Sequence, residues 1–78
     1  KMTPKNPFRW GTQAHRLYER LTYGPIWNIE IVKELAILGY QKKIAQIRRA
    51  LRGTGVTVKT RAFNHRGTLV EYRLAKET

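Results

Sequence analysis

Residues Gly39–Gly55, which read G-Y-Q-K-K-I-A-Q-I-R-R-A-L-R-G-T-G, decide how the rest of the chain is arranged. Successive residues of an α-helix are rotated by about 100°, so the place of each side chain around the helix follows from the sequence. The apolar side chains fall within one narrow arc: Tyr40, Ile44, Ile47 and Leu51. Long cationic and amide side chains lie opposite: Lys42, Gln46 and Arg49, with Ala45 and Arg52 beside them. We therefore predict an amphipathic helix from about Gln41 to Arg52, with glycines beyond both ends.

A first helix is predicted near the start of the chain. Thr12 belongs to the residue types that cap helix N-termini. Apolar residues then recur at helical spacing: Ala14, Leu17 and Leu21. This pattern predicts a helix over Gln13–Thr22, which Gly24 and Pro25 end.

A second helix is predicted between that one and the amphipathic stretch. Pro25–Trp27 is too short for a helix, so we expect a strand of two or three residues there, followed by Asn28 as an N-cap. Glu30 lies in the first turn, where the helix dipole favours an anion. The apolar residues predict a largely buried helix to about Leu38, with Gly39 as a left-handed C-cap.

After Gly55 the hydrophobic period changes to two, which predicts a β-hairpin. For the apolar residues of both strands to share one face, the numbers of paired residues must sum to an even value. We predict that Val58 pairs with Tyr72 and Lys59 with Glu71. The loop is then Asn64–Arg66, closed by Gly67 in a left-handed conformation.

The predicted order is helix, short strand, helix, helix, strand, strand. If the short strand pairs with the last one, the sheet has three strands and the fold is an α+β winged helix-turn-helix. We expect an extended N-terminal arm over residues 1–11, the domain over residues 12–75 and a disordered tail over residues 76–78.

The chain resembles small helix-turn-helix proteins of phages and prophages. The similar stretches are T-Q-A-H-R-L-Y-E-R-L, N-I-E-I-V-K-E-L-A-I-L-G-Y, I-A-Q-I-R-R-A-L and E-Y-R-L, within about Thr12 to Leu74. The resemblance implies DNA binding, usually in the regulation of transcription or recombination. The chain departs from that pattern at R-A-L-R-G-T-G-V, where the turn into the predicted wing is longer than usual.

The charge of the chain favours a polyanionic partner. The chain has sixteen Lys and Arg residues but only five Glu and no Asp, which gives a net charge of +11. Between Glu34 and Glu71 there is no acidic residue. Basic residues at this density bind phosphates because each contact releases condensed counterions. The chain has neither cysteine nor a long apolar run, so we expect a soluble protein of a bacterial host cytoplasm or nucleoid.

The predicted contacts with DNA follow from the faces of these elements. Residues expected to read base edges in the major groove are Gln41, Lys42, Gln46 and Arg49. Residues expected to bind the DNA backbone are Lys43, Arg52, Lys59 and Arg61. The wing tip Asn64, His65 and Arg66 and the arm residues Lys5 and Arg9 are further candidates. Arg48 lies beside the apolar stripe, so we assign it a structural role.

Catalysis, metal binding and a cofactor are not expected. The chain lacks Ser, Cys and Asp, and His15 and His65 have no carboxylate at a spacing suited to a metal site or a nucleophile–base pair. The G-T-G sequence lacks the Lys-Ser or Lys-Thr of a phosphate-binding loop. The aromatic residues Trp10, Tyr23, Trp27 and Tyr40 are expected in the core rather than stacked on bases.

The sequence therefore predicts sequence-specific binding of double-stranded DNA, as a phage-type transcriptional regulator or a recombination accessory factor. A homodimer on DNA and a larger protein partner are both compatible with it. Two alternatives stay open: an RNA-binding module that uses the same basic surface, and a protein-interaction domain that docks a larger replication or recombination enzyme.

Overall fold

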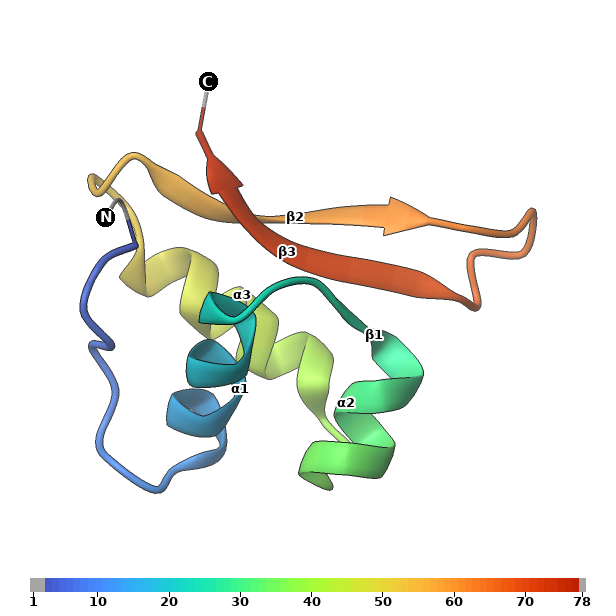
Figure 1. Ribbon diagram of the computed structural model, residues 1–78, viewed down its shortest axis with the longest axis horizontal. Helices are drawn as coiled ribbons and strands as arrows, with labels where there is room; N and C mark the ends of the chain where they lie inside the picture. The colour runs from blue at the N-terminus through green and yellow to red at the C-terminus, as the bar shows by residue number, and fades with distance from the viewer. Residues whose placement is uncertain (1–2, 78) are drawn as a thin grey trace.

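The first helix begins and ends where the sequence predicts. In the computed structural model, which describes residues 3–77, α1 spans Gln13–Thr22. The Thr12 hydroxyl accepts a hydrogen bond from the His15 backbone N–H at 3.2 Å, so Thr12 is the N-cap. Gly24 follows with φ of +140°, and the chain turns there into β1 (Ile26–Trp27). Figure 1 shows α1 and the two later helices on one side of the sheet.

Helix α2 (Asn28–Leu35) differs from the prediction at both ends. Trp27 rather than Asn28 is the N-cap residue, and its backbone N–H donates to Glu30 Oε1 at 2.9 Å. At the other end, Ala36 with φ of +56° leaves the helix, three residues before the predicted cap Gly39. Gly39 has φ of −91° and instead precedes the next helix.

The early end of α2 places Ile37 in the core. Its side chain is 0% exposed, whereas Leu38 is 78% exposed. A non-glycine residue in the left-handed conformation costs about 1–2 kcal/mol. Burying an isoleucine side chain gains about 1.5–3 kcal/mol, so burial outweighs the strain at Ala36. The sequence contains no glycine or proline that marks this stop.

Helix α3 (Tyr40–Ala50) has the predicted amphipathic character. Ile44 and Ile47 are buried on it, and Leu51 is buried just beyond its end. Tyr40 is half-buried and its ring meets Tyr72 edge-on, with the centroids 5.9 Å apart. These residues hold α3 against the rest of the core and leave its other face to solvent.

The sheet has the order β1-β3-β2 and is antiparallel throughout. Ile26 of β1 pairs with Tyr72 of β3 (Val70–Lys76), as the prediction that the short strand joins the last one requires. Between β2 (Val56–Ala62) and β3 the predicted parity is confirmed, but the register is shifted by two residues.

The shifted register corrects the pairing at the hairpin. Val58 pairs with Leu74 and Lys59 with Arg73, where we predicted Tyr72 and Glu71. The reason is the side chain of Asn64, whose Oδ1 accepts the Thr68 N–H at 3.0 Å and whose Nδ2 donates to Thr68 Oγ1 at 2.7 Å. This lengthens the loop to residues 64–68. Gly67 within it has the predicted positive φ, +67°.

The C-terminal residues are ordered by the same shift. Lys76 pairs with Val56, and the Glu77 backbone N–H donates to the Gly55 carbonyl at 2.8 Å. The predicted disordered tail is therefore wrong for Lys76 and Glu77, and Thr78 lies outside the described residues.

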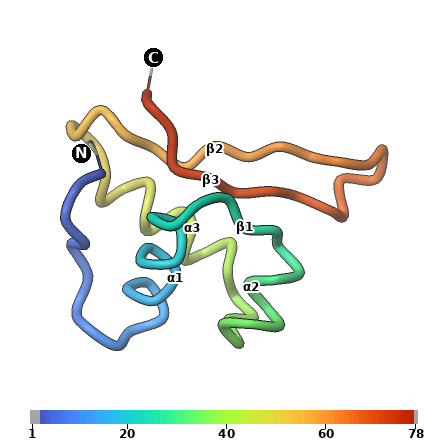
Figure 2. The backbone as a smooth tube through the Cα atoms, in the orientation of Figure 1, coloured from blue at the N-terminus to red at the C-terminus, as the bar shows by residue number. Residues whose placement is uncertain are grey.

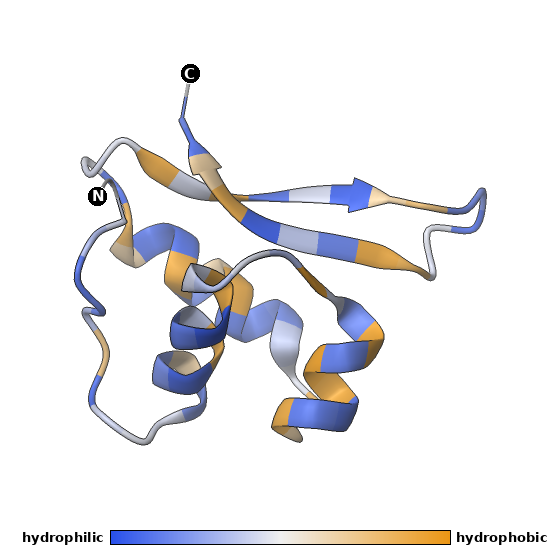
Figure 3. Ribbon diagram, in the orientation of Figure 1, coloured by the Kyte–Doolittle hydropathy of each residue, from blue (hydrophilic) through white to orange (hydrophobic). Residues whose placement is uncertain are grey.

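The core fills the space between the helices and the near half of the sheet. Its fully buried side chains include Leu17, Tyr18, Ile26, Ile31, Ile37, Ile47 and Leu51. The far half of the hairpin extends past the helices, as the tube in Figure 2 shows. Figure 3 shows hydrophobic residues where α1, α3 and the sheet meet and hydrophilic residues at the hairpin loop. From Thr60 to Thr68 every residue is exposed, so no core supports this half.

Candidate functional site

The exposed face of α3 carries all four residues predicted to read bases. Gln41, Lys42, Gln46 and Arg49 are exposed on this helix. Lys43 is half-buried at the flank, and Arg52 is exposed two residues beyond the end of the helix. The buried stripe described above fixes the rotation of α3, so these side chains are directed outward together.

Arg48 has the structural role that the sequence indicates, through a partner in the sheet. Its Nε donates to the Val58 carbonyl at 3.0 Å, which ties α3 to β2. Arg48 also lies near Tyr72. Burial raises the pKa of Tyr72 above its ordinary value of 10.0, Tyr40 adds to this increase, and the positive charge of Arg48 opposes it.

The face of the sheet that points away from the helices carries three basic residues of the hairpin: Lys59, Arg61 and Arg73. Lys59 and Arg61 alternate with the buried Val56 and Val58 on β2. The register places Lys59 opposite Arg73, a like-charge pair that destabilises a sheet unless an anion lies nearby. It places Arg61 opposite Glu71, whose carboxylate offsets the charge of Arg61. A bound phosphate would therefore relieve more electrostatic repulsion at Lys59 than at Arg61.

The hairpin loop contains residues with different roles. Asn64 closes the loop through its hydrogen bonds to Thr68, so turn geometry accounts for this residue. His65 and Arg66 are exposed between them. Arg66 is the arginine of this loop, between the end of β2 and the start of β3.

The N-terminal arm is not brought together with the hairpin tip. Asn6 Nδ2 donates to the His15 carbonyl at 3.0 Å and to Glu19 Oε1 at 2.9 Å. The Tyr18 hydroxyl donates to the Pro4 carbonyl at 2.6 Å. These bonds dock the arm on α1, at the end of the molecule opposite the hairpin loop (Figure 2). Lys5 and Arg9 are exposed there, on a different surface from that loop.

The cations of α1 contact the protein itself. Arg16 donates to the Leu35 carbonyl at the end of α2. Arg20 donates to the carbonyls of Gly24 at 3.1 Å and Pro25 at 3.3 Å. Carbonyls at chain turns and helix ends lack regular partners, so these arginines serve the fold.

Sequence reasoning missed an aromatic pair at the base of the projecting hairpin. The rings of Trp27 and Phe63 stack with centroids 4.6 Å apart and planes at 12°. The guanidinium carbon of Arg61 lies 5.0 Å from the centroid of the Phe63 ring. The alternation of residues along β2 already placed Phe63 on the same face as Arg61, but the partner across the sheet depends on the register.

The prediction that Trp10 and Tyr23 lie in the core is wrong, because their side chains are 85% and 83% exposed.

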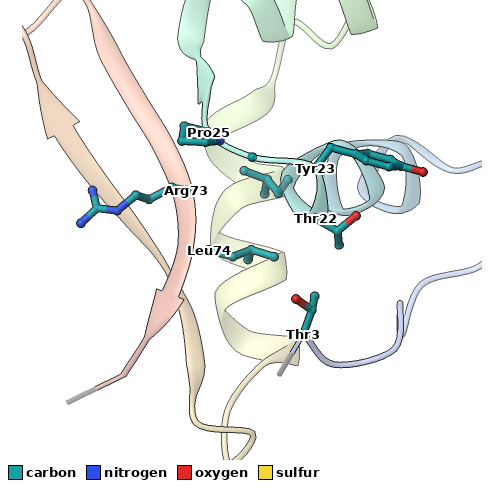
Figure 4. A pocket seen from close by; sticks show the side chains of 8 residues that line it. Thr3, Thr22, Tyr23, Pro25, Arg73 and Leu74 are labelled. Atoms are coloured by element: carbon teal, nitrogen blue, oxygen red, sulfur yellow. The ribbon is translucent and has the colours of Figure 1, made fainter. Parts of the chain in front are cut away.

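A hollow beside the arm contains no cluster of catalytic or metal-binding side chains. A cavity of about 360 Å³ lies between the arm, the turn after α1 and β3, lined by Thr3, Leu21, Thr22, Tyr23, Gly24, Pro25, Arg73 and Leu74. Figure 4 shows the Arg73 guanidinium extending to the side of β3 away from Leu74. Within residues 3–77 no group of three His, Cys, Asp or Glu side chains is placed to hold a metal ion.

Comparisons with protein-family models, with curated proteins and with solved structures find no match for this chain. In the described part of the chain, no helix has the length and apolar character needed to cross a membrane.

Proposed function

We propose that this chain is a winged helix-turn-helix domain of the phage type that binds double-stranded DNA. The order of its elements and the sheet order β1-β3-β2 support this fold assignment. In the proposal, α3 enters the major groove, and the β2–β3 hairpin is the wing, which follows the backbone or the minor groove. The biological role is regulation of transcription or assistance in recombination.

The observation that carries the proposal is the outer face of α3. Apart from Ala45 and Ala50, its exposed residues are cationic or amide-bearing, and no acidic residue occurs between Glu34 and Glu71. Arginine and lysine pair with guanine O6 and N7, and glutamine pairs with adenine N6 and N7. A face of this composition on a rigidly packed helix suits a major groove, which admits one α-helix.

The hairpin adds contacts that read no sequence. Lys59 beside Arg73 forms a cationic pair that a phosphate would neutralise, and Arg61 lies on the same face of the sheet. Lys43 on the flank of α3 and Arg52 just beyond its end are the candidates for phosphate contacts beside the recognition helix. Arg66 at the loop is the candidate for a narrow minor groove, because its negative potential attracts a guanidinium. Lys5 and Arg9 are left out of the proposed interface because the arm is docked at the other end of the molecule.

The test is a binding assay with the Lys42→Ala/Arg49→Ala variant, on duplexes selected from a random pool by the wild-type protein. Loss of one good base contact costs about 1–3 kcal/mol, so each substitution should weaken binding about 5- to 150-fold. Lys33→Ala removes the same charge from the exposed surface of α2 and should leave the affinity within about twofold.

Single-stranded DNA and RNA of the same sequence are measured in parallel. Unchanged duplex affinity in the double variant would reject α3 as the recognition helix. A preference of the wild type for RNA would favour the RNA-binding alternative. Absence of salt-dependent binding to any nucleic acid would leave the protein-interaction alternative. An inverted repeat among the selected duplexes would indicate a dimer.

A further inference from the structure

Two adjacent residues connect the start of α2 to the projecting half of the hairpin. Asn28 Nδ2 donates to the Thr68 carbonyl at 2.8 Å, and Asn28 Oδ1 accepts the Val70 backbone N–H at 3.1 Å. One residue earlier, Trp27 stacks on Phe63. These contacts join segments far apart in the sequence: Asn28 and Thr68 are separated by 40 positions.

The Asn28 side chain continues the ladder between β1 and β3. Ile26 pairs with Tyr72 and Trp27 with Glu71, so the next pair in this register would be Asn28 with Val70. The backbone turns into α2 at Asn28 and cannot supply it. In place of the missing backbone groups, the carboxamide accepts from Val70 of β3 and donates to Thr68 at the end of the loop.

The projecting hairpin needs such support. Both faces of β2 are exposed from Thr60 onward, and an isolated two-stranded hairpin is marginally stable in water. Without a fixed support, the loop would sample many orientations, and binding would have to pay for ordering it.

We propose that Trp27 and Asn28 are positioning residues that hold the hairpin loop at a fixed place relative to α3. This inference rests on the proposed function. Trp27 and Asn28 lie at the junction of β1 and α2, and α2 leads through a short turn into α3. The recognition helix and the wing are therefore held from the same point. Asn28 and Trp27 act through their contacts with the hairpin, and in this way they set where Arg66 meets the DNA.

The first measurement is amide hydrogen exchange in the full chain without DNA. Asn28→Ala should accelerate exchange of the Val70 amide by about tenfold or more, because its acceptor is gone. Asn28→Asp retains the acceptor for the Val70 amide but has no donor for the Thr68 carbonyl, so its Val70 amide should exchange more slowly than in Asn28→Ala. Lys33→Ala, one turn further along α2, should leave Val70 unchanged. Circular dichroism checks that each variant keeps its helices.

The second measurement is a double-mutant cycle on the selected duplex. Arg66→Ala should lower the affinity of the wild type about fivefold, but less than about twofold in the Asn28→Ala background, where the loop is no longer held. Arg49→Ala should lower the affinity for the duplex by the same factor in the wild-type and Asn28→Ala backgrounds. A merely structural Asn28 would lower the affinity without changing the effect of Arg66→Ala.

Two outcomes separate this inference from the proposed function. If the wild type binds duplex DNA and Arg66→Ala costs the same with and without Asn28, the domain binds DNA and the positioning role is rejected. If the wild type binds no duplex, the proposed function fails, and the positioning role toward DNA fails with it. An unchanged Val70 exchange rate in Asn28→Ala would also reject the proposal.

Discussion

Arg48 and Arg49 are neighbours in the sequence with different surroundings. Arg48 donates to the Val58 carbonyl, whereas Arg49 is exposed on the outer face of α3. Successive residues of a helix are rotated by about 100°, roughly a quarter turn. Arg48 therefore stabilises the fold, while Arg49 belongs to the proposed interface.

This difference predicts that substitution of Arg48 affects mainly stability, whereas substitution of Arg49 affects mainly DNA binding. Arg48→Ala should lower the free energy of unfolding by about 1 kcal/mol, because the Val58 carbonyl loses its charged donor at a partly exposed site. Arg49→Ala should change stability by less than about 0.5 kcal/mol and weaken duplex binding. Urea unfolding and a binding titration of both variants check this. Equal effects of the two variants on stability would contradict the assignment.

The raised pKa values of Tyr18 and Tyr72 predict that the protein loses stability at alkaline pH. Burial raises the pKa of Tyr18 above 10.0, with a contribution from Glu19, and burial also raises that of Tyr72. A raised pKa in the folded state means that folding favours the protonated hydroxyl. This stabilisation is complete below pH 10.0, the ordinary value, and is lost as the pH rises through the folded-state pKa values.

The Tyr18→Phe variant isolates one of these contributions. It removes the hydroxyl that bonds to Pro4, so we expect a loss of about 1 kcal/mol near pH 7. The further loss of stability above pH 10 should be smaller than in the wild type, since one titrating group is gone. Urea unfolding at pH 7 and at several values above 10 measures both effects. An alkaline loss as steep as in the wild type would show that Tyr18 does not contribute.

At the scale of elements, the end of α2 contains removable strain. Ala36 adopts φ of +56°, which glycine accepts without a steric penalty. Ala36→Gly should therefore stabilise the protein by about 0.5–1 kcal/mol, the left-handed penalty less the added entropy of the unfolded chain. Ala45→Gly is the matched control in the middle of α3 and should destabilise by about 1 kcal/mol. Thermal unfolding compares the two variants; a destabilising Ala36→Gly would show that Ala36 is not strained.

The elements show which features the sequence could predict. The bounds of α1, the pairing of β1 with β3 and the buried stripe of α3 follow from local patterns of caps, prolines and apolar spacing. The register does not, because parity leaves shifts by two residues equally acceptable, and the side chain of Asn64 decided between them. The end of α2 depended on the burial of Ile37, a tertiary effect.

The candidate site divides in the same way. The outward residues of α3 were predictable from helical periodicity alone. The like-charge pair Lys59–Arg73 and the stack of Trp27 on Phe63 were not, because both depend on which residues face each other across the sheet. The docked position of the arm depends on Asn6 and Tyr18, whose partners lie far along the chain.

For the whole molecule, the positive charge predicts a steep dependence of DNA binding on salt. Each neutralised phosphate contributes about −0.9 to the slope of log K against log salt. The predicted backbone contacts are Lys43, Arg52, Lys59 and Arg61, so their combined slope should be about −3.6. Titrations between low and physiological salt measure it. Lys59→Ala should make the slope shallower by about 0.9, and Lys33→Ala should not change it. Affinity independent of salt would contradict an electrostatic interface.

The last strand also determines how the molecule can be held for measurement. Because β3 pairs as far as Lys76 and Glu77 bonds to Gly55, the C-terminal end of the strand is firmly attached at the end of the hairpin opposite its loop (Figure 1). A biosensor tether or a fluorophore joined beyond this end would be carried by a rigid strand and would stay away from Arg66. Immobilisation there should leave both α3 and the loop accessible to a duplex in solution.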